Sequence, residues 1–176
     1  MATSGAKTAS SKGEGMGKKK HYDILGWFDG CCEPKNPGGH AAWGALVNVG
    51  EQQVYAEGGY CGCDRTTSNN VAEYAGFVAA LTEALKYPGK ILICGDSRLV
   101  ICHLSAEASR ELGYSGKWKV NGGHYMPYHL KAKELYEANK GRITLRWISR
   151  DDNSVCDWLS KKVLKDMGVV FRIQPE

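Results

Sequence analysis

Apolar and polar residues follow one another along this chain in blocks whose spacing predicts strands and helices. Short apolar runs predict strands over residues 24–28, 42–49, 53–61, 91–94 and 143–148. Apolar positions at helical spacing predict helices over residues 71–86, 98–104, 127–140 and 153–167. Gly50 lies between the second and third strands, which indicates a hairpin. Residues 105–126 show neither pattern, and we expect them to be irregular.

This order of elements indicates an α/β domain in which helices cover one mixed sheet. The first strand ends at Asp29 and Gly30, and the strand over 91–94 is followed by Gly95 and Asp96. The strand over 91–94 contains no turn residue and no charge, so we expect it to be central and buried.

The composition divides the 176 residues into a tail, one domain and a short extension. Residues 1–20 contain Gly, Ser, Thr, Ala and Lys without an apolar period, which predicts a disordered basic tail. We expect the folded domain over residues 21–167 and a C-terminal extension over 168–176. The chain is 43% hydrophobic, which is enough to bury a core without disulfide or metal support.

The apolar pattern and the cysteines argue against several classes of protein. No run of 18 apolar residues is present, and residues 1–20 lack the apolar middle of a secretory signal, so we expect neither a membrane span nor secretion. The seven cysteines form no CxxC pair, which leaves a zinc ribbon unsupported. We expect an intracellular protein with reduced thiols, and a disulfide or a cysteine-bound metal is the alternative.

The net charge of +4 lies entirely in the tail, since residues 1–20 carry five Lys and one Glu. The remaining residues carry 18 basic and 18 acidic groups and are neutral overall. Any contact with nucleic acid must therefore depend on a local patch of charge. We expect a monomer.

Four carboxylates stand at positions that favour a common site. Asp29 and Asp96 follow the two buried strands, Glu73 lies in the first turn of an apolar helix, and Asp157 has apolar neighbours on the last helix. In open α/β sheets, chemistry gathers outside the carboxyl ends of the strands. Converging carboxylates stay ionised together only beside a cation, and hard oxygen ligands suit Mg²⁺ or Mn²⁺. A pair of such ions can support phosphodiester hydrolysis.

Each carboxylate also has an ordinary structural explanation. Asp29 can be a turn residue before Gly30, Glu73 can complement the helix dipole, and Asp157 can pair with Lys161. Taken singly, these explanations are the stronger ones. The joint occurrence of the four residues is what favours a site.

The motifs around these carboxylates closely resemble the type 1 ribonuclease H family. They are Phe-Asp-Gly at 28–30, Asn-Asn-Val-Ala-Glu-Tyr at 69–74, Gly-Asp-Ser at 95–97 and Asn-x-x-x-Asp at 153–157. None of them is specific alone, but their order and spacing are, over about residues 22–166. The resemblance implies an RNase H-like α/β fold, a five-stranded mixed sheet with helices on both faces.

The resemblance also implies a reaction, the endonucleolytic cleavage of the RNA strand of an RNA–DNA hybrid. The products would carry 5′-phosphate and 3′-hydroxyl ends, and the cofactor would be two Mg²⁺ ions, with Mn²⁺ as an alternative. By this match Asp29 bridges the two ions, and Asp157 helps to hold the ion that activates the attacking water. Glu73 and Asp96 help to hold the ion at the leaving 3′ oxygen.

Polar residues that match the family's substrate contacts surround the predicted site. Asn36, Asn69 and Asn70 match residues that contact the minor groove of the hybrid, and we expect Ser68 or Thr67 to bind a phosphate of the DNA strand. Amides can bond both 2′-hydroxyls and base edges, and the 2′-hydroxyl distinguishes RNA. The alternatives are a turn for Asn36 and helix capping for Asn69 and Asn70.

Residues 110–133 form a basic segment with a local charge of +4 and interleaved aromatic residues. Basic and aromatic side chains together suit a nucleic-acid backbone. The segment resembles the family's basic protrusion around Lys117, Trp118 and Lys119. The alternative is a solvated loop whose aromatic rings pack on the domain.

The sequence departs from many family members in the loop before Asp157. That loop is short and contains no His, and it resembles the subgroup that carries Arg there. Arg150 then lies near the scissile phosphate or the attacking water. The alternative is a surface ion pair of Arg150 with Asp151 or Asp152.

Two other functions compete with hybrid cleavage. A non-catalytic RNase H-like module would normally have lost acidic residues, whereas all four are present here. Another nuclease of the same fold, such as a junction resolvase or a reverse transcriptase domain, fits less well with the basic segment and with Asn69 and Asn70.

Overall fold

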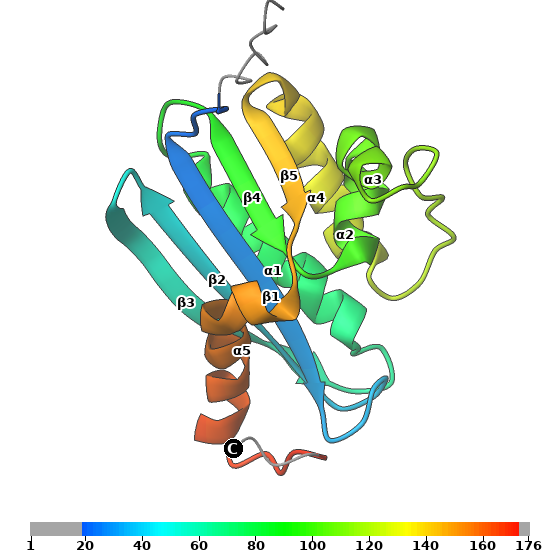
Figure 1. Ribbon diagram of the computed structural model, residues 1–176. Coiled ribbons are helices and arrows are strands. Elements are labelled where there is room, and N and C mark those ends of the chain that lie inside the picture. The colour runs from blue at the N-terminus through cyan, green and yellow to red at the C-terminus, as the bar shows by residue number, and fades with distance from the viewer. Residues whose placement is uncertain (1–18, 173–176) are drawn as a thin grey trace, which may run out of the picture.

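A computed structural model describes residues 19–172, which form a five-stranded mixed sheet (Figure 1). The strands are β1 (Ile24–Glu33), β2 (His40–Val49), β3 (Gln52–Cys63), β4 (Ile91–Gly95) and β5 (Ile143–Trp147). Their order across the sheet is β3-β2-β1-β4-β5. The pairs β1–β2 and β2–β3 are antiparallel, and the pairs β1–β4 and β4–β5 are parallel. The predicted mixed sheet is confirmed, with β1 at its centre and β4 as a fully buried interior strand.

Helices cover both faces of this sheet. They are α1 (Asn69–Ala84), α2 (Arg98–Leu104), α3 (Ala106–Glu111), α4 (Met126–Ala138) and α5 (Ser154–Asp166), with 3₁₀ turns at Lys140–Arg142 and Arg150–Asn153. Helix α1 lies behind the sheet and α5 lies in front of it (Figure 1). The glycines mark the two faces, since a Cβ on Gly30 would point at α1 and one on Gly44 would point at α5.

The main core lies between the sheet and α1. Ile24 and Phe28 of β1, Ile93 of β4 and Phe77 of α1 are completely buried. The rings of Phe28 and Phe77 meet edge to face, with their centroids 5.4 Å apart. Burial of each such side chain contributes about 1.5–3 kcal/mol, so this layer fixes α1 against the strands.

The N-terminus of α1 is set by a side-chain cap. Ser68 has an extended backbone, and its side chain accepts a hydrogen bond from the Val71 backbone N–H at 3.2 Å. Such a cap stabilises a helix by about 1 kcal/mol. It fixes the rotation of the first turns of α1, and therefore the direction of Glu73.

The structure corrects the predicted end of the first strand. Strand β1 does not end at Asp29 but continues to Glu33, paired with β2 along its whole length. Gly30 is a packing residue of this strand and not part of a turn. The parallel pairing with β4 does stop at Phe28, opposite Gly95. Asp29 and Asp96 therefore still lie side by side, just beyond the end of that pairing.

Residues 105–126 are not entirely irregular as predicted. They include α3, whose first turn is capped by Ser105, since its side chain accepts a hydrogen bond from the Ala108 backbone N–H at 3.1 Å. A six-residue helix is too short to show an apolar period. Residues 115–123 contain no helix or strand, in line with the prediction.

The structure describes only part of the predicted tail and of the predicted extension. Residues 1–18 and 173–176 lie outside the described residues. Across residues 19–172, no helix is both long and apolar enough to cross a bilayer. All seven cysteines fall in this range and all are free thiols.

The contact between β1 and α1 leads to a first prediction. A Cβ on Gly30 would lie 2.4 Å from the Glu73 backbone nitrogen and 2.5 Å from the Ala72 carbonyl carbon. Gly30→Ala should therefore push α1 away from β1 and lower the free energy of unfolding by about 1–3 kcal/mol, as measured by urea denaturation. Gly141→Ala is the control, because a Cβ there meets no atom within 4 Å. Equal stability of the two variants would mean that α1 does not need a glycine at position 30 of β1.

Candidate active site

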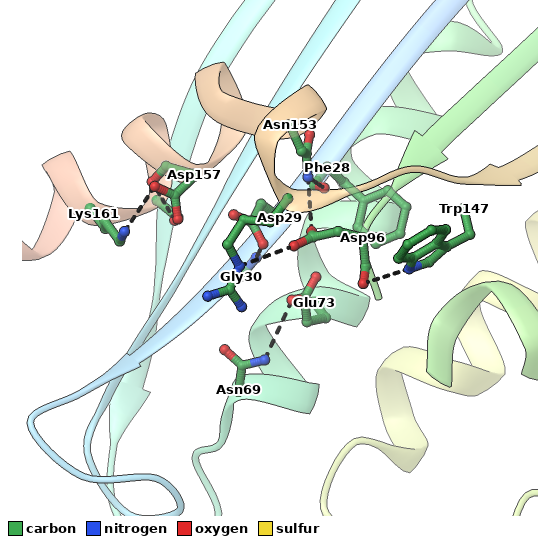
Figure 2. A network of polar contacts seen from close by, with 12 residues as sticks. Phe28, Asp29, Gly30, Asn69, Glu73, Asp96, Trp147, Asn153, Asp157 and Lys161 are labelled. Carbon is green, nitrogen blue, oxygen red and sulfur yellow. Dashed lines mark hydrogen bonds and ion pairs between the residues drawn. The ribbon is translucent and has the colours of Figure 1, made fainter. Parts of the chain in front are cut away.

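Three carboxylates from different elements converge just beyond the end of the pairing between β1 and β4. Oxygen atoms of Asp29, Glu73 and Asp96 lie within 4.8 Å of one another. Asp29 comes from the middle of β1, Glu73 from α1, and Asp96 directly follows β4 (Figure 2). Asp29 and Glu73 are each only 5% exposed. The structure thus brings together three of the four predicted carboxylates.

Neighbouring side chains hold Asp96 in place. The Asn153 side-chain N–H₂ donates to Asp96 Oδ1 at 3.0 Å and to the Phe28 carbonyl oxygen at 2.8 Å. The Trp147 indole N–H donates to the Asp96 carbonyl oxygen at 3.0 Å. These bonds tie Asp96 to β1, to β5 and to the residue just before α5 (Figure 2).

Only one of the two carboxylate oxygens of Glu73 has a hydrogen-bond partner among the described residues. Its Oε1 atom accepts a weak hydrogen bond from the Asn69 side chain at 3.4 Å. Its Oε2 atom is buried and has no hydrogen-bond partner among the described residues. A buried polar atom without a partner is costly, and a bound cation is one way to satisfy it.

Burial and the charges of neighbouring carboxylates disfavour the charged forms of Asp29 and Glu73. Burial raises the pKa of Asp29 from 3.8 to about 7, and the nearby Asp96 and Asp157 contribute to the same rise. Burial, together with Asp29 and Asp96, also raises the pKa of Glu73 well above its usual value. A divalent cation would reverse both effects. The all-oxygen donor set and the unpaired Glu73 oxygen fit a hard cation such as Mg²⁺.

Asp157 lies outside this cluster of three. Its Oδ2 atom accepts a hydrogen bond from the Lys161 ammonium at 2.8 Å, one turn along α5. It lines the same pocket of about 320 Å³ as Asp29. The expected ion pair with Lys161 is therefore present, and a direct role of Asp157 in metal binding stays a prediction.

The predicted groove contacts cluster around the start of α1. The Asn36 side-chain oxygen accepts a hydrogen bond from the Asn69 backbone N–H at 2.9 Å. This bond joins the β1–β2 loop to the helix end that carries Ser68, Asn69 and Asn70. Ser68 is the cap of the helix, so capping and substrate contact would share these residues. Their contacts to nucleic acid stay predictions.

The basic segment runs from the end of α3 into α4, and Lys117 and Lys119 lie in the loop between the two helices. Lys117 and Lys119 are exposed, whereas Trp118 is half-buried between them. The Trp118 backbone N–H donates to the Cys102 carbonyl oxygen at 2.8 Å, and its ring meets Tyr114 edge to face at 5.0 Å. Trp118 therefore anchors the segment. The Lys117 ammonium lies 3.9 Å from a carboxylate oxygen of Glu137 in a solvent-exposed ion pair.

Arg150 lies at the edge of the carboxylate cluster. Its Nε atom is 3.6 Å from Asp96 Oδ2, and its side chain is 85% exposed. The structure pairs Arg150 with Asp96, and not with Asp151 or Asp152 as in the alternative interpretation. Asp152 instead accepts a hydrogen bond from the Ser149 hydroxyl at 3.0 Å.

We predicted no role from the sequence for two features of this site. Asn153 belongs to the Asn-x-x-x-Asp motif, and that motif was the available signal for the residue that positions Asp96. Arg172 and Glu33 also line the 320 Å³ pocket. No pattern in the sequence links these two residues, which are 139 positions apart.

Comparison with known proteins places the chain in a family. Residues 27–163 match the profile of the family described as reverse transcriptase-like. A curated relative, the bifunctional protein Rv2228c of Mycobacterium tuberculosis strain H37Rv, is 29% identical over 130 residues, or 73% of this chain and 32% of that protein. The chain thus spans about a third of the length of the curated relatives that it matches.

Solved structures show the same fold. RNase H1 of the halophilic archaeon Halobacterium salinarum NRC-1 has a TM-score of 0.63 at 26% identity, over 81% of this chain and 98% of that one. The N-terminal RNase H domain of Rv2228c has a TM-score of 0.63 at 25% identity, over 79% and 96% of the two chains. LC11-RNase H1, solved in complex with RNA/DNA hybrid, has a TM-score of 0.65 at 20% identity, over 82% and 98%.

These matches confirm the resemblance that the motifs carry. The family profile extends over most of the described residues, and the structural similarity to the archaeal RNase H1 extends over 81% of the chain. The chain therefore belongs to the reverse transcriptase-like family and has the fold of RNase H.

Proposed function

We propose that this protein is a metal-dependent endoribonuclease that hydrolyses the RNA strand of RNA–DNA hybrids and leaves 5′-phosphate and 3′-hydroxyl ends. The observation that carries the proposal is the cluster of Asp29, Glu73 and Asp96, with oxygen atoms within 4.8 Å of one another and one buried oxygen unpaired. Asp157, in the same pocket, is the proposed fourth metal-binding carboxylate. The proposed cofactor is a pair of Mg²⁺ ions, with Mn²⁺ as an alternative.

The surroundings of the cluster support a hybrid as the substrate. The amides of Asn36, Asn69 and Asn70 stand at the start of the helix that carries Glu73, within reach of a strand that enters the site. Amides can bond the 2′-hydroxyls that mark RNA. The RNA/DNA hybrid in the LC11-RNase H1 structure, which shares the fold, supports the same class of substrate.

Different residues of the site would have different roles in hydrolysis. Asp29, Glu73, Asp96 and Asp157 would hold the ions, which when bound supply charge to the phosphate and make water a better nucleophile. Asn153 orients Asp96, and Asn69 orients Glu73, so the ligands are positioned before substrate arrives.

Two basic side chains complete the site. Arg150 is largely exposed beside Asp96 and would bind an oxygen of the scissile phosphate. Lys161 holds Asp157 at the side of the pocket. The remaining affinity would come from Lys117 and Lys119, which stand on a separate segment.

One assay tests the function itself. Labelled RNA–DNA hybrid, double-stranded RNA and double-stranded DNA are incubated with the protein in Mg²⁺, in Mn²⁺ and in EDTA. The proposal expects cleavage of the RNA strand of the hybrid alone, and only with a divalent ion. Cleavage of all-DNA duplex, or cleavage in EDTA, would overturn it. Intact hybrid with either ion would favour a non-catalytic binding module.

The role of Asp29 gives a second prediction. Asp29→Asn should abolish hybrid cleavage and keep the fold, because it removes a central ligand and relieves the repulsion among buried carboxylates. Asp166→Asn is the matched control, since Asp166 is exposed on α5 and pairs with Lys162. Initial rates and circular dichroism measure the two properties. Substantial Mg²⁺-dependent cleavage by the Asp29 variant would show that the site is assigned wrongly.

The raised pKa of Asp29 predicts a pH dependence of stability in metal-free buffer. Between pH 4 and pH 7 the folded protein keeps a proton that the unfolded chain has released, because the pKa of Asp29 rises from 3.8 to about 7 on folding. The stability of the unsubstituted protein should therefore fall as the pH rises through this window. Asparagine has no such proton to lose.

The stability gain of Asp29→Asn should thus be near zero below pH 4 and should reach on the order of 4 kcal/mol above pH 7. Urea denaturation in EDTA at several pH values measures it. A gain that does not change with pH would mean that burial and repulsion at Asp29 are unimportant.

The basic segment gives a fourth prediction, on binding rather than chemistry. Replacing Lys117 and Lys119 by Ala should weaken hybrid binding and lower the log–log salt slope by about 1 to 2. Maximal single-turnover cleavage at saturating enzyme should hardly change. The control replaces Lys86 and Lys90, which precede β4 and so lie at the other end of the sheet from Asp96. An unchanged binding constant and salt slope would mean that the segment is only a solvated loop.

A further inference from the structure

The chain does not leave the domain after α5 but turns back toward the pocket. Gly168 adopts the left-handed conformation, with φ 78°. The Gly168 and Val169 backbone N–H groups donate to the carbonyl oxygens of Lys165 and Leu164, at 2.9 and 3.0 Å. This is the Schellman arrangement that ends a helix and reverses the chain. The residues that follow therefore run beside α5 instead of away from it.

Phe171 fixes the returning segment to the domain. It is 6% exposed and packs in a small apolar cluster with Cys31 of β1, Ala42 of β2 and Leu164 of α5. Burial of a phenylalanine side chain is worth about 1.5–3 kcal/mol, enough to hold a short segment in place. The next residue, Arg172, is thereby brought against β1.

Arg172 makes specific contacts with the last residues of β1. Its backbone N–H donates to Glu33 Oε2 at 3.0 Å, and its Nε atom donates to the same oxygen at 3.2 Å. Its Nη2 atom donates to the Cys32 carbonyl oxygen at 3.0 Å. The Nη1 atom has no partner among the described residues. The side chain is half exposed, so this free end of the guanidinium can reach a ligand.

This guanidinium lines the same pocket as the carboxylates. Asp29, Asp157, Lys161, Arg150, Glu33 and Arg172 all line the 320 Å³ pocket. Glu33 follows Asp29 by four residues on β1, which corresponds to about 13 Å along the strand and returns to the same face. A nucleic-acid strand advances about 3.4 Å per nucleotide along the helix axis. Arg172 thus lies a few nucleotides from a phosphate held at the carboxylates.

We propose that Arg172 binds a backbone phosphate of the strand that enters the active-site pocket, a few nucleotides from the scissile bond. The inference rests on the proposed function, since it needs that strand in the pocket. A guanidinium suits the task, because the free Nη1 atom can donate to a phosphate oxygen while Nε and Nη2 stay bonded to β1, and because the group never loses its charge. The segment that carries it lies beyond residues 27–163, the part of the chain that matches the family profile.

Glu33 positions Arg172 and also opposes the phosphate. Its two carboxylate oxygens accept hydrogen bonds from the Nε and Nη2 atoms of Arg172, but its negative charge lies beside the site where the phosphate would bind. Glu33→Gln keeps a hydrogen-bonding side chain of the same shape and removes that charge. If Arg172 binds phosphate, this variant should bind hybrid as tightly as the unsubstituted protein or more tightly. If the pair only fastens the segment, the variant should lose whatever Arg172→Ala loses.

The test compares steady-state cleavage and binding in a small set of variants. Arg172→Ala should raise KM for a hybrid by about 3- to 10-fold, leave kcat within about twofold, and lower the log–log salt slope by roughly 0.7 to 0.9. Arg172→Lys should recover part of the loss, because it keeps the charge. Lys162→Ala is the control, since Lys162 neighbours Lys161 on α5 but pairs with Asp166 outside the pocket.

Uncharged methylphosphonate linkages, placed one at a time along the RNA strand, locate the contact. One linkage a few nucleotides from the cleavage position should weaken binding by the unsubstituted protein and have no further effect on Arg172→Ala. Additive losses at every linkage, or equal losses in Arg172→Ala and Glu33→Gln, would overturn the inference. Absence of cleavage by the unsubstituted protein would instead refute the proposed function. Thermal melting of each variant separates a loss of contact from a loss of fold.

Discussion

The direct contact between the backbones of β1 and α1 is the constraint on which the rest of this structure depends. Gly30 has no side chain where the strand meets the backbone of Glu73, and Gly76 has none where the helix meets the Asp29 carbonyl oxygen, 2.8 Å from a Cβ built there. Two elements can approach this closely only where such glycines face each other. The approach brings two acids of different elements together and lets the apolar layer of Phe28 and Phe77 close behind them.

The close packing of carboxylates has an electrostatic cost, and two features of the structure reduce it. Inside the cluster, a proton on a buried acid is favoured over a second negative charge, as the raised pKa of Asp29 indicates. Two carboxylates also each face a cation: Asp96 faces Arg150 and Asp157 faces Lys161. The folded domain is neutral overall, and its pocket is lined by acidic and basic groups together. This arrangement suits a polyanion that must approach bound cations.

The parts of the structure that depend on local sequence were predictable, and those that depend on distant partners were not. The buried β4 strand and Asp96 after it followed from an uninterrupted apolar run. The end of β1 was predicted too early, because Gly30 has the same signature in a turn as in a packing contact. The motif pointed to Asn153 but not to its role, since its partners lie 57 and 125 positions away. Arg172 meets Glu33 across 139 positions for the same reason.

The reversal of the chain after α5 has a practical consequence for how the two ends of the protein can be used. The described chain enters the sheet at the start of β1, whereas it reaches Arg172 at the other end of that strand, at the rim of the pocket (Figure 1). An affinity tag or fusion partner joined after Arg172 would begin beside the pocket that Arg172 lines. A partner joined ahead of β1 would begin at the far end of the sheet. The two fusions of one domain are therefore not equivalent, and immobilisation through the N-terminal side leaves the pocket open.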